Sequence, residues 1–112
     1  MKNEGGRVSF LAKTPKPPYF AVIFSSIRTE GDNGYGDMAT RMVELASEQP
    51  GFLGVESARE SMGVTVSYWQ DLESIQAWKK NVEHCEARQL GREQWYSEFK
   101  VRISRVEREY GV

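Results

Sequence analysis

One side chain of this sequence is suited to acid–base chemistry near neutral pH, and that is His84, the only histidine. An imidazole with its ordinary pKa can remove a proton from a phenol or bind a metal such as iron. The same residue also fits a surface position at the start of a short helix. Cys85 follows it directly, but adjacent helical residues point about 100° apart, which separates a thiol from an imidazole. We therefore predict His84, without Cys85, as the catalytic residue.

Substrate-binding residues are predicted from aromatic side chains that can stack a flat ligand and from polar side chains near them. Tyr68 and Trp69 are neighbours on a predicted strand, so only one of them can face a shared interior. Trp78 has the helical spacing of a buried stripe, which is typical of core residues as well as of pocket walls. The full set predicted to bind substrate is Trp78, Tyr68, Trp69, Trp95, Phe24, Ser26 and Arg28. A place in the core or in a dimer interface, or a solvated strand end for Arg28, is the open alternative.

Alternating strand and helix patterns must position these residues. Tyr19–Arg28 begins with apolar residues on both faces, which predicts a strand buried on both sides. Val64–Trp69 alternates with the period of a strand, and Asp71 stands where the N-cap of the next helix belongs. In chain order the predicted elements are a strand at Tyr19–Arg28, a helix at Tyr35–Gln49, strands at Phe52–Ala58 and Val64–Trp69, helices at Asp71–Val82 and His84–Leu90, and a strand at Gln94–Arg108.

Three local signals set boundaries within these elements. Gly63 is predicted to take a positive φ in the turn between the two middle strands. Asn81 is predicted to break the second helix, so that a separate short helix follows and is closed by Gly91. The apolar pattern of the last strand shifts at Arg105-Val106, which indicates a bulge or the end of the strand.

The order β-α-β-β-α-β predicts an α+β fold, the ferredoxin-like motif, with one antiparallel sheet and helices on one face only. The other face would expose a large apolar area, which is rarely left in water. A second copy of the chain can cover it, and two such sheets can close into a dimeric α+β barrel. We therefore predict a homodimer. Residues 1–18, rich in glycine and proline, are predicted to form a flexible N-terminal arm, and residues 19–110 the domain.

Composition limits the classes of partner. The 112 residues carry a formal net charge of −1 and no basic stripe, which argues against nucleic-acid binding. No apolar run approaches the ~20 residues of a membrane span, and no polybasic patch or signal peptide is recognised, so no membrane partner is predicted. No cysteine or histidine spacing indicates a metal site. The single cysteine fits a reducing cytoplasm, where we predict the protein to be located.

Three runs of the sequence resemble the antibiotic biosynthesis monooxygenase (ABM) domain family. They are ELASEQPGFLGVES, TVSYWQDLESIQAWK and HCEARQLGREQWY, and the resemblance covers roughly Tyr19–Tyr110. Its most specific parts are the helix-PGF-strand junction and the spacing from Trp69 to Trp78. The resemblance implies dimeric α+β barrels built from ferredoxin-like subunits. It also implies one of two chemistries, which are oxygenation of polycyclic phenols or anthrones without a cofactor, and haem degradation.

Haem-degrading members of the family use an Asn on the first strand, a Trp on the helix after the hairpin, and a His further along. Trp78 matches the Trp, Ser25–Ile27 stands at the Asn position, and His84 lies one turn before Arg88, where the family's His would fall. We therefore predict the other branch, a monooxygenase without flavin, metal or other cofactor that acts on a flat aromatic or polycyclic molecule. The alternative is a non-enzymatic dimeric module for small-ligand binding or stress, and a haem-degrading enzyme ranks behind both.

Overall fold

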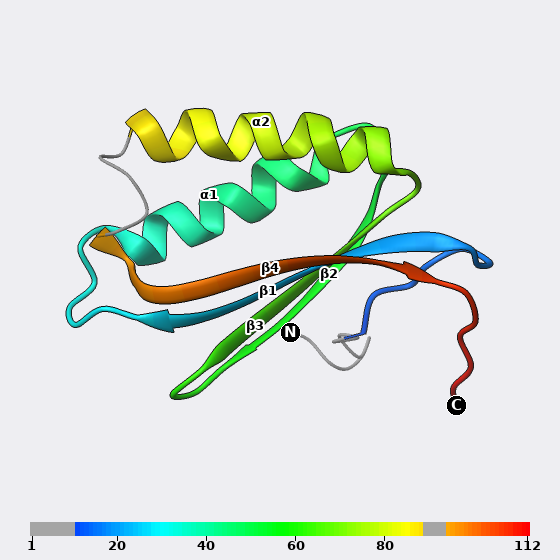
Figure 1. Ribbon diagram of the computed structural model, residues 1–112, viewed down its shortest axis with the longest axis horizontal. Coiled ribbons are helices and arrows are strands. Elements are labelled where there is room, and N and C mark those ends of the chain that lie inside the picture. The colour runs from blue at the N-terminus through cyan, green and yellow to red at the C-terminus, as the bar shows by residue number, and fades with distance from the viewer. Residues whose placement is uncertain (1–10, 89–93) are drawn as a thin grey trace, which may run out of the picture.

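The computed structural model describes residues 11–88 and 94–112, and the side chains of residues 84–88 lie outside that description. Four strands form one antiparallel sheet in the order β2-β3-β1-β4, and both helices lie on the same face of it (Figure 1). This arrangement confirms the predicted ferredoxin-like α+β fold. The elements are β1 (Tyr19–Arg28), α1 (Tyr35–Ser47), β2 (Phe52–Arg59), β3 (Gly63–Trp69), α2 (Leu72–Arg88) and β4 (Tyr96–Val106).

The alternation of side chains along β1 gives the sheet two different faces. Phe20 and Val22 pack against the buried core under the helices. The intervening residues Ala21 and Ile23 must therefore point to the opposite side, which Val66 shares because it pairs with Ile23. We call these two sides the helix face and the open face. The core consists of Ala46, Trp69 and Ile75, with Phe20, Val22, Phe52 and Trp78 packed against it.

Helix α2 begins at a side-chain cap, as the sequence predicts. Asp71 Oδ1 accepts a hydrogen bond from the Ser74 N–H at 2.8 Å, which is the geometry of an N-cap. Hydrogen bonds from the Ser74 hydroxyl and N–H lower the pKa of Asp71. Gly51, in the turn after α1, has a φ of 86°, and a Cβ there would lie 2.1 Å from Ser74 Oγ. The turn therefore needs glycine both for its backbone and for its approach to α2.

The prediction that Asn81 breaks the second helix is wrong. Helix α2 runs without a break from Leu72 to Arg88. The Asn81 side chain donates hydrogen bonds to Gln49 Oε1 at 3.1 Å and to the Ala77 carbonyl at 3.4 Å. These bonds satisfy the amide without taking its backbone out of the helix, as happens where a polar side chain bonds back to the preceding turn. The predicted closure at Gly91 lies outside the described residues.

The prediction of a positive φ at Gly63 is also wrong. Among the described residues, positive φ occurs at Gly31, Asn33, Gly34 and Gly51, and Gly63 is the first residue of β3. Glycine is needed there for space, because a Cβ on Gly63 would lie 2.2 Å from Arg59 Cζ. The residue therefore makes room for a side chain of the neighbouring strand.

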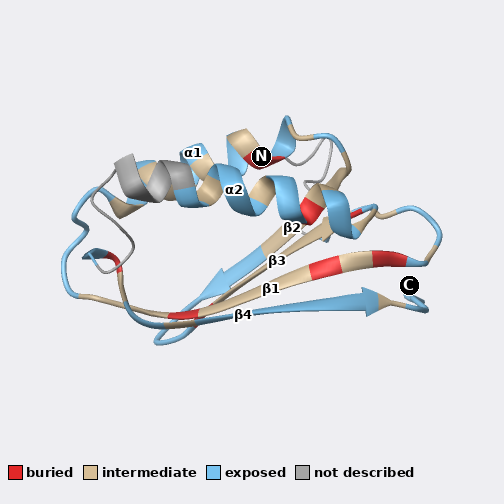
Figure 2. Cartoon of the chain, turned by 45° about the horizontal axis from the view of Figure 1, so that its top comes forward, coloured by how far each residue is buried: buried red, intermediate tan, exposed pale blue. Residues whose placement is uncertain are grey.

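At Arg105-Val106 the sequence predicted either a bulge or the end of the last strand, and the structure shows the end of the strand. Pairing with β1 stays regular through Arg105 and Val106, and the strand ends at Val106. The register shifts instead at the other end, between Ile27 and Arg28. β4 is an edge strand and is exposed along most of its length, whereas β1 beside it has buried stretches (Figure 2).

Residues 11–18 cover part of the open face. The Ala12 N–H donates to Glu56 Oε2 at 2.9 Å, and a Cβ on Gly54 would lie 2.8 Å from Ala12 Cβ. The Tyr68 hydroxyl donates to the other oxygen of Glu56 at 2.8 Å. Burial, together with this hydrogen bond, raises the pKa of Tyr68 to about 12. The phenol is therefore neutral near pH 7 and is held as a donor to the carboxylate.

The C-terminal residues meet the same segment. The Thr14 hydroxyl lies 2.7 Å from Glu109 Oε1 and donates to it, and the Tyr19 hydroxyl bonds the same carboxylate. These bonds lower the pKa of Glu109. The Tyr19 residue is buried, with only 4% of its surface exposed. The predicted division into an arm at residues 1–18 and a domain at residues 19–110 stays a prediction, because residues 1–10 lie outside the described part of the chain.

Candidate functional site

One end of the helix face is a closely packed apolar core. Trp69 is fully buried, with 0% of its surface exposed, and it stacks on Trp78 with 6.0 Å between the ring centroids. Phe52 meets Trp69 edge-on at 5.4 Å. Trp69 Nε1–H donates to Ser67 Oγ at 2.9 Å, so its polar atom has a partner inside the molecule. We call this group, Ala46, Phe52, Trp69, Ile75 and Trp78, the tryptophan core.

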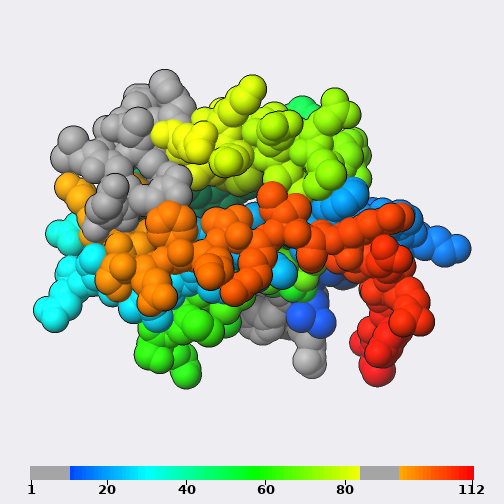
Figure 3. Space-filling model, viewed as in Figure 1, coloured from blue at the N-terminus to red at the C-terminus, as the bar shows by residue number. Residues whose placement is uncertain are grey.

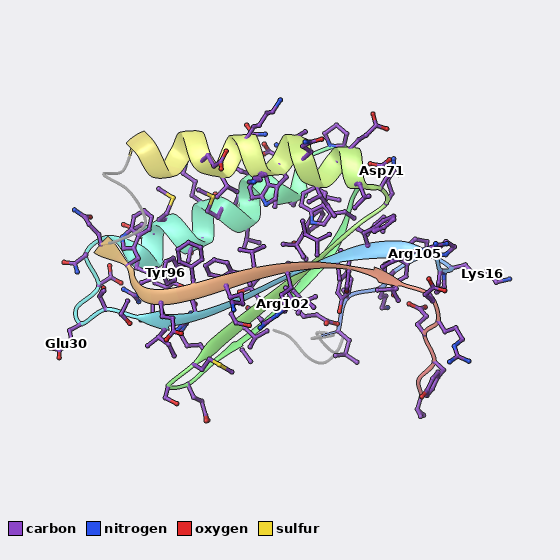
Figure 4. The ribbon with its side chains drawn as sticks, in the orientation of Figure 1. Lys16, Glu30, Asp71, Tyr96, Arg102 and Arg105 are labelled. Carbon is purple, nitrogen blue, oxygen red and sulfur yellow. The ribbon has the colours of Figure 1, made fainter. Side chains whose placement is uncertain are left out.

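The other end of the helix face carries an aromatic cluster made of Phe24, Tyr35, Tyr96 and Phe99. The Phe24 ring lies 5.2 Å from that of Tyr96 and 5.7 Å from that of Phe99. Tyr35, the first residue of α1, meets Tyr96 edge-on at 5.7 Å. Tyr96 points from the start of β4 toward α1 (Figure 4). Flat rings from a strand pair and a helix therefore gather at one place, as they do where aromatic ligands bind.

Arg28 borders the aromatic cluster and is firmly held. Its Cζ lies 3.6 Å from the centroid of the Tyr35 ring. Its Nε–H donates to the Trp95 carbonyl at 2.8 Å, and Nη2 donates to two carbonyls of the loop before α1 at 3.1 and 3.3 Å. Trp95 is 3% exposed and donates from Nε1 to the Asn33 carbonyl at 3.0 Å. Arg28 and Trp95 thus hold the loop before α1 beside the start of β4. In Figure 3 the loop is cyan and the start of β4 is orange, and their atoms lie together at one end of the molecule.

Arg59 reaches the same place from the end of β2. Its guanidinium bonds the Ser26 hydroxyl through Nη2 and lies 3.5 Å from the Ser26 carbonyl through Nη1. Ser26 is only 3% exposed, so a buried hydroxyl is used to position this arginine. Arg59 Cζ lies 5.9 Å from the Tyr35 ring centroid. The space that Gly63 leaves empty is what admits the guanidinium.

The cluster is bordered by positive charge that is not paired with any carboxylate of the described residues. Within the described part of the chain, neither Arg28 nor Arg59 forms an ion pair with a carboxylate. The nearby Asp32 carboxylate instead accepts hydrogen bonds from the N–H groups of Gly34 and Gly36 at 2.9 and 3.1 Å. Because guanidinium groups prefer carboxylate or phosphate partners, this arrangement favours an anionic group of a ligand.

Tyr96 supplies a neutral hydroxyl to the cluster. Burial raises the pKa of Tyr96 most strongly, and its hydrogen bond with Tyr35 raises it further. The charges of Arg59 and Arg28 act in the opposite direction without cancelling this effect. The phenol therefore stays protonated near pH 7, where it can donate or accept a hydrogen bond but cannot act as a general base.

The predicted substrate-binding residues lie in three places rather than one. Phe24, Ser26, Arg28 and Trp95 meet at the aromatic cluster. Trp69 and Trp78 stack in the tryptophan core, and Tyr68 lies on the open face, so the sheet separates it from the others. The backbone of His84 belongs to α2, but its side chain lies outside the described residues. The roles of all these residues stay predictions.

Sequence reasoning missed Arg59, Tyr35 and Phe99. The sequence did contain a signal for Arg59. Arg59 stands just before the hairpin turn and Gly63 just after it, and the two residues pair with each other. A glycine opposite a long charged side chain gives that side chain room. Tyr35 carried no such signal, since its helical spacing is equally typical of a core residue.

Other features of the described residues do not add a site. They hold no group of three or more His, Cys, Asp or Glu residues placed to bind a metal ion, and no helix among them is long and apolar enough to span a membrane. An open surface depression of about 320 Å³ lies where α1 ends and α2 begins. Its lining consists of Gln49, Pro50, Asp71, Glu73, Ser74 and Ala77.

Comparison with known proteins identifies relatives by sequence. A family model described as antibiotic biosynthesis monooxygenase matches residues 18–90. The protein YqjZ of Bacillus subtilis (strain 168), described as uncharacterized, is 53% identical over 104 residues, which cover 91% of this chain and 91% of YqjZ.

Two solved structures are similar in fold. PA3566 from Pseudomonas aeruginosa has a TM-score of 0.62 at 16% identity and covers 86% of this chain and 99% of its own. SnoaB, described as a cofactor-independent oxygenase from Streptomyces nogalater, has a TM-score of 0.61 at 13% identity and covers 86% of this chain and 98% of its own. At such low identity the likeness shows the fold alone.

Proposed function

Because this chain belongs to the antibiotic biosynthesis monooxygenase family, we propose that it is a cofactor-independent monooxygenase that acts on a flat aromatic small molecule. The observation that carries the proposal is the aromatic cluster of the helix face, where Phe24, Tyr35, Tyr96 and Phe99 meet beside Arg28. The oxygenase activity stated for SnoaB, which has the same fold, supports it. The single cysteine is in keeping with a reducing cytoplasm as the place of action.

The proposed reaction needs no redox cofactor because the substrate supplies the electrons. An anthrone loses a proton from its CH₂ group, and the carbanion reduces O₂ and then bonds to it. The resulting peroxide loses water, so that one oxygen atom becomes the new carbonyl oxygen and the other leaves as H₂O. Oxidation of CH₂ to C=O releases the four electrons that O₂ accepts. The protein has to hold the ring, stabilise the anion and provide a base.

The residues divide these tasks. The aromatic cluster holds the ring by stacking, and the charge of Arg28 stabilises an enolate oxygen. Tyr96 is protonated and serves as a hydrogen-bond donor. His84 remains the proposed base, since an imidazole is matched to proton abstraction near neutral pH.

Oxygen consumption tests this function. The purified protein is mixed with anthrone in aerated buffer, and O₂ uptake and anthraquinone formation are followed against the uncatalysed rate. We expect a loss of at least about 100-fold in kcat for His84→Ala, because general bases contribute that much or more. Lys79→Ala, an exposed change on α2, is the matched control and should keep full activity. Unchanged turnover in His84→Ala would remove His84 from the mechanism.

We also propose that a second copy of the chain covers the open face. Ile23, Val64 and Val66 are only partly buried there, and residues 11–18 lie against the part of this face around Glu56. An arginine at Val66 should repel an apolar partner surface, so Val66→Arg is expected to give a monomer in light scattering at micromolar concentration, where the unaltered chain gives a dimer. A monomeric unaltered chain would contradict the shared barrel.

A non-enzymatic ligand-binding module is the second candidate. The observation in its favour is the tryptophan core, because Trp69 and Trp78 fill the layer under α2 with their own rings. Binding of anthrone with no turnover above the uncatalysed rate would support this candidate. A haem titration is a separate arm, and the absence of a Soret shift at micromolar haem would exclude the haem-degrading branch of the family.

A further inference from the structure

We propose that the aromatic cluster takes a ring compound that carries a carboxylate, and that Arg59, held beside Arg28 at the Tyr35 ring, binds this carboxylate. The inference rests on the proposed function, since it names the chemical class of ligand for the same site. Arg59 has no assigned role in the family resemblance and was not predicted from the sequence.

Two arginines share one aromatic ring. Arg28 Cζ lies 3.6 Å and Arg59 Cζ 5.9 Å from the centroid of Tyr35. Each cation gains from the ring, but two cations at one ring repel each other. With no carboxylate paired to either arginine in the described residues, an anion brought in by a ligand would relieve this repulsion.

The two arginines have different tasks. Arg28 is bound through Nε and Nη2 to backbone carbonyls, so it contributes fixed charge. Arg59 is bound through Nη1 and Nη2 to Ser26 and is exposed to solvent as a residue, so its Nε–H and the second hydrogen of each Nη are left for a ligand. A planar guanidinium presents two parallel N–H groups that match a carboxylate.

The position of Arg59 is built into the sheet. Ser26 on β1 is 3% exposed and bonds the guanidinium, and Gly63 on β3 leaves the space in which it lies. Residues of β1 and β3 therefore fix the position of an arginine that comes from β2.

Calorimetry with a pair of matched compounds tests the inference. The probes are 1-hydroxy-2-naphthoate and 1-naphthol, which share a ring and a hydroxyl and differ in the carboxylate. We expect the unaltered chain to bind the naphthoate about 10- to 100-fold more tightly, the range of one charge-assisted contact. The preference should shrink as salt is raised, because Arg59 is exposed.

Three variants separate the causes, two at Arg59 and one at a control arginine. Arg59→Gln should lose the naphthoate preference and keep its affinity for 1-naphthol. Arg59→Lys keeps the charge without the planar fork and should fall between the two. Arg41→Gln removes an exposed arginine from α1 and should change neither affinity.

The outcomes distinguish this inference from the proposed function. Equal binding of both probes to the unaltered chain would overturn the carboxylate site and leave the oxygenase proposal standing. A preference that Arg59→Gln retains would also overturn it. Tight naphthoate binding lost in Arg59→Gln, together with no turnover of anthrone, would support the carboxylate site while contradicting the oxygenase. Failure of both probes to bind would overturn the carboxylate site, and the anthrone assay decides the oxygenase proposal separately.

Discussion

The two ends of the helix face use aromatic residues for different purposes. In the tryptophan core, Trp69 is 0% exposed, packs against Trp78 and Phe52, and satisfies its only polar atom through Ser67. In the aromatic cluster, the rings of Tyr35 and Tyr96 lie beside two arginines that have no carboxylate partner in the described residues. The polar atom of the buried Trp69 ring therefore has a partner, while the two arginines of the second end have no carboxylate partner among the described residues.

If the aromatic cluster binds the ligand as proposed, this difference separates the residues for stability from the residues for binding. A close-packed apolar group contributes free energy of folding and leaves nothing for a ligand to satisfy. A guanidinium without an anion contributes little to folding, but it gives a ligand a partner. We therefore expect changes in the tryptophan core to affect unfolding, and changes around Arg59 to affect binding.

The largest expected effect is on folding, from Trp69→Ala. Removing a fully buried indole should lower the free energy of unfolding by about 3–5 kcal/mol, because it leaves a cavity as well as losing apolar burial. Urea unfolding followed by circular dichroism measures it. Trp69→Phe retains most of the volume and provides a folded variant if the alanine variant does not fold.

Phe99→Ala is the matched control at the other end. Phe99 is only partly buried, so its removal should cost about 1–2 kcal/mol. Equal losses for the two variants would break the comparison, since the aromatic cluster would then be as much a part of the folding core as Trp69 is.

A smaller effect on stability and a larger one on binding are expected for Gly63→Ala. The new methyl group meets only the far end of the Arg59 side chain, which can move, so the free energy of unfolding should change by less than about 1 kcal/mol. Affinity for 1-hydroxy-2-naphthoate should fall about tenfold as Arg59 is displaced.

A double-mutant cycle sharpens this result. Adding Gly63→Ala to Arg59→Gln should cause no further loss of naphthoate affinity, because the methyl group acts only through Arg59. Additive losses would show that Gly63 matters for another reason.

The smallest expected effect is a pH dependence from Tyr96. Because its pKa is raised in the folded chain, the neutral phenol stabilises the fold fully below pH 10.0, the ordinary value, and this contribution is lost as pH rises through the folded-state value. Tyr96→Phe should lower stability by about 1 kcal/mol at pH 7, through the lost bond with Tyr35, and should reduce the decline above pH 10, of which Tyr68 and Tyr19 keep their share. Urea unfolding at several pH values measures both.

Ser97→Ala, an exposed change on the next residue of β4, should keep the full decline. If Tyr96→Phe shows the same steep decline as the unaltered chain, folding does not raise the pKa of Tyr96.

Much of the fold could be predicted because its signals are local. The period of two in Val64–Trp69 placed Tyr68 and Trp69 on opposite faces, and Asp71 marked the first turn of α2, as the Ser74 bond confirms. The same local reasoning failed at Asn81 and Gly63. Each has a residue type that breaks or turns a chain, and each is held in a regular element by a partner that is distant in sequence, Asn81 by its bond to Gln49 and Gly63 by its pairing with Ser26 on β1.

The sequence alone determined the order of the strands and helices, which residues of β1 and β3 share a face, and the family resemblance, because these follow from spacing along one chain. Only the tertiary structure decided that the predicted binding residues divide among three places. It also decided that Arg59 reaches Ser26 and Tyr35, contacts that join β2 to β1 and α1. The physical reason is that a side chain's partners across a sheet depend on strand register and on the space that neighbouring residues leave. Neither can be read from the type of that residue alone.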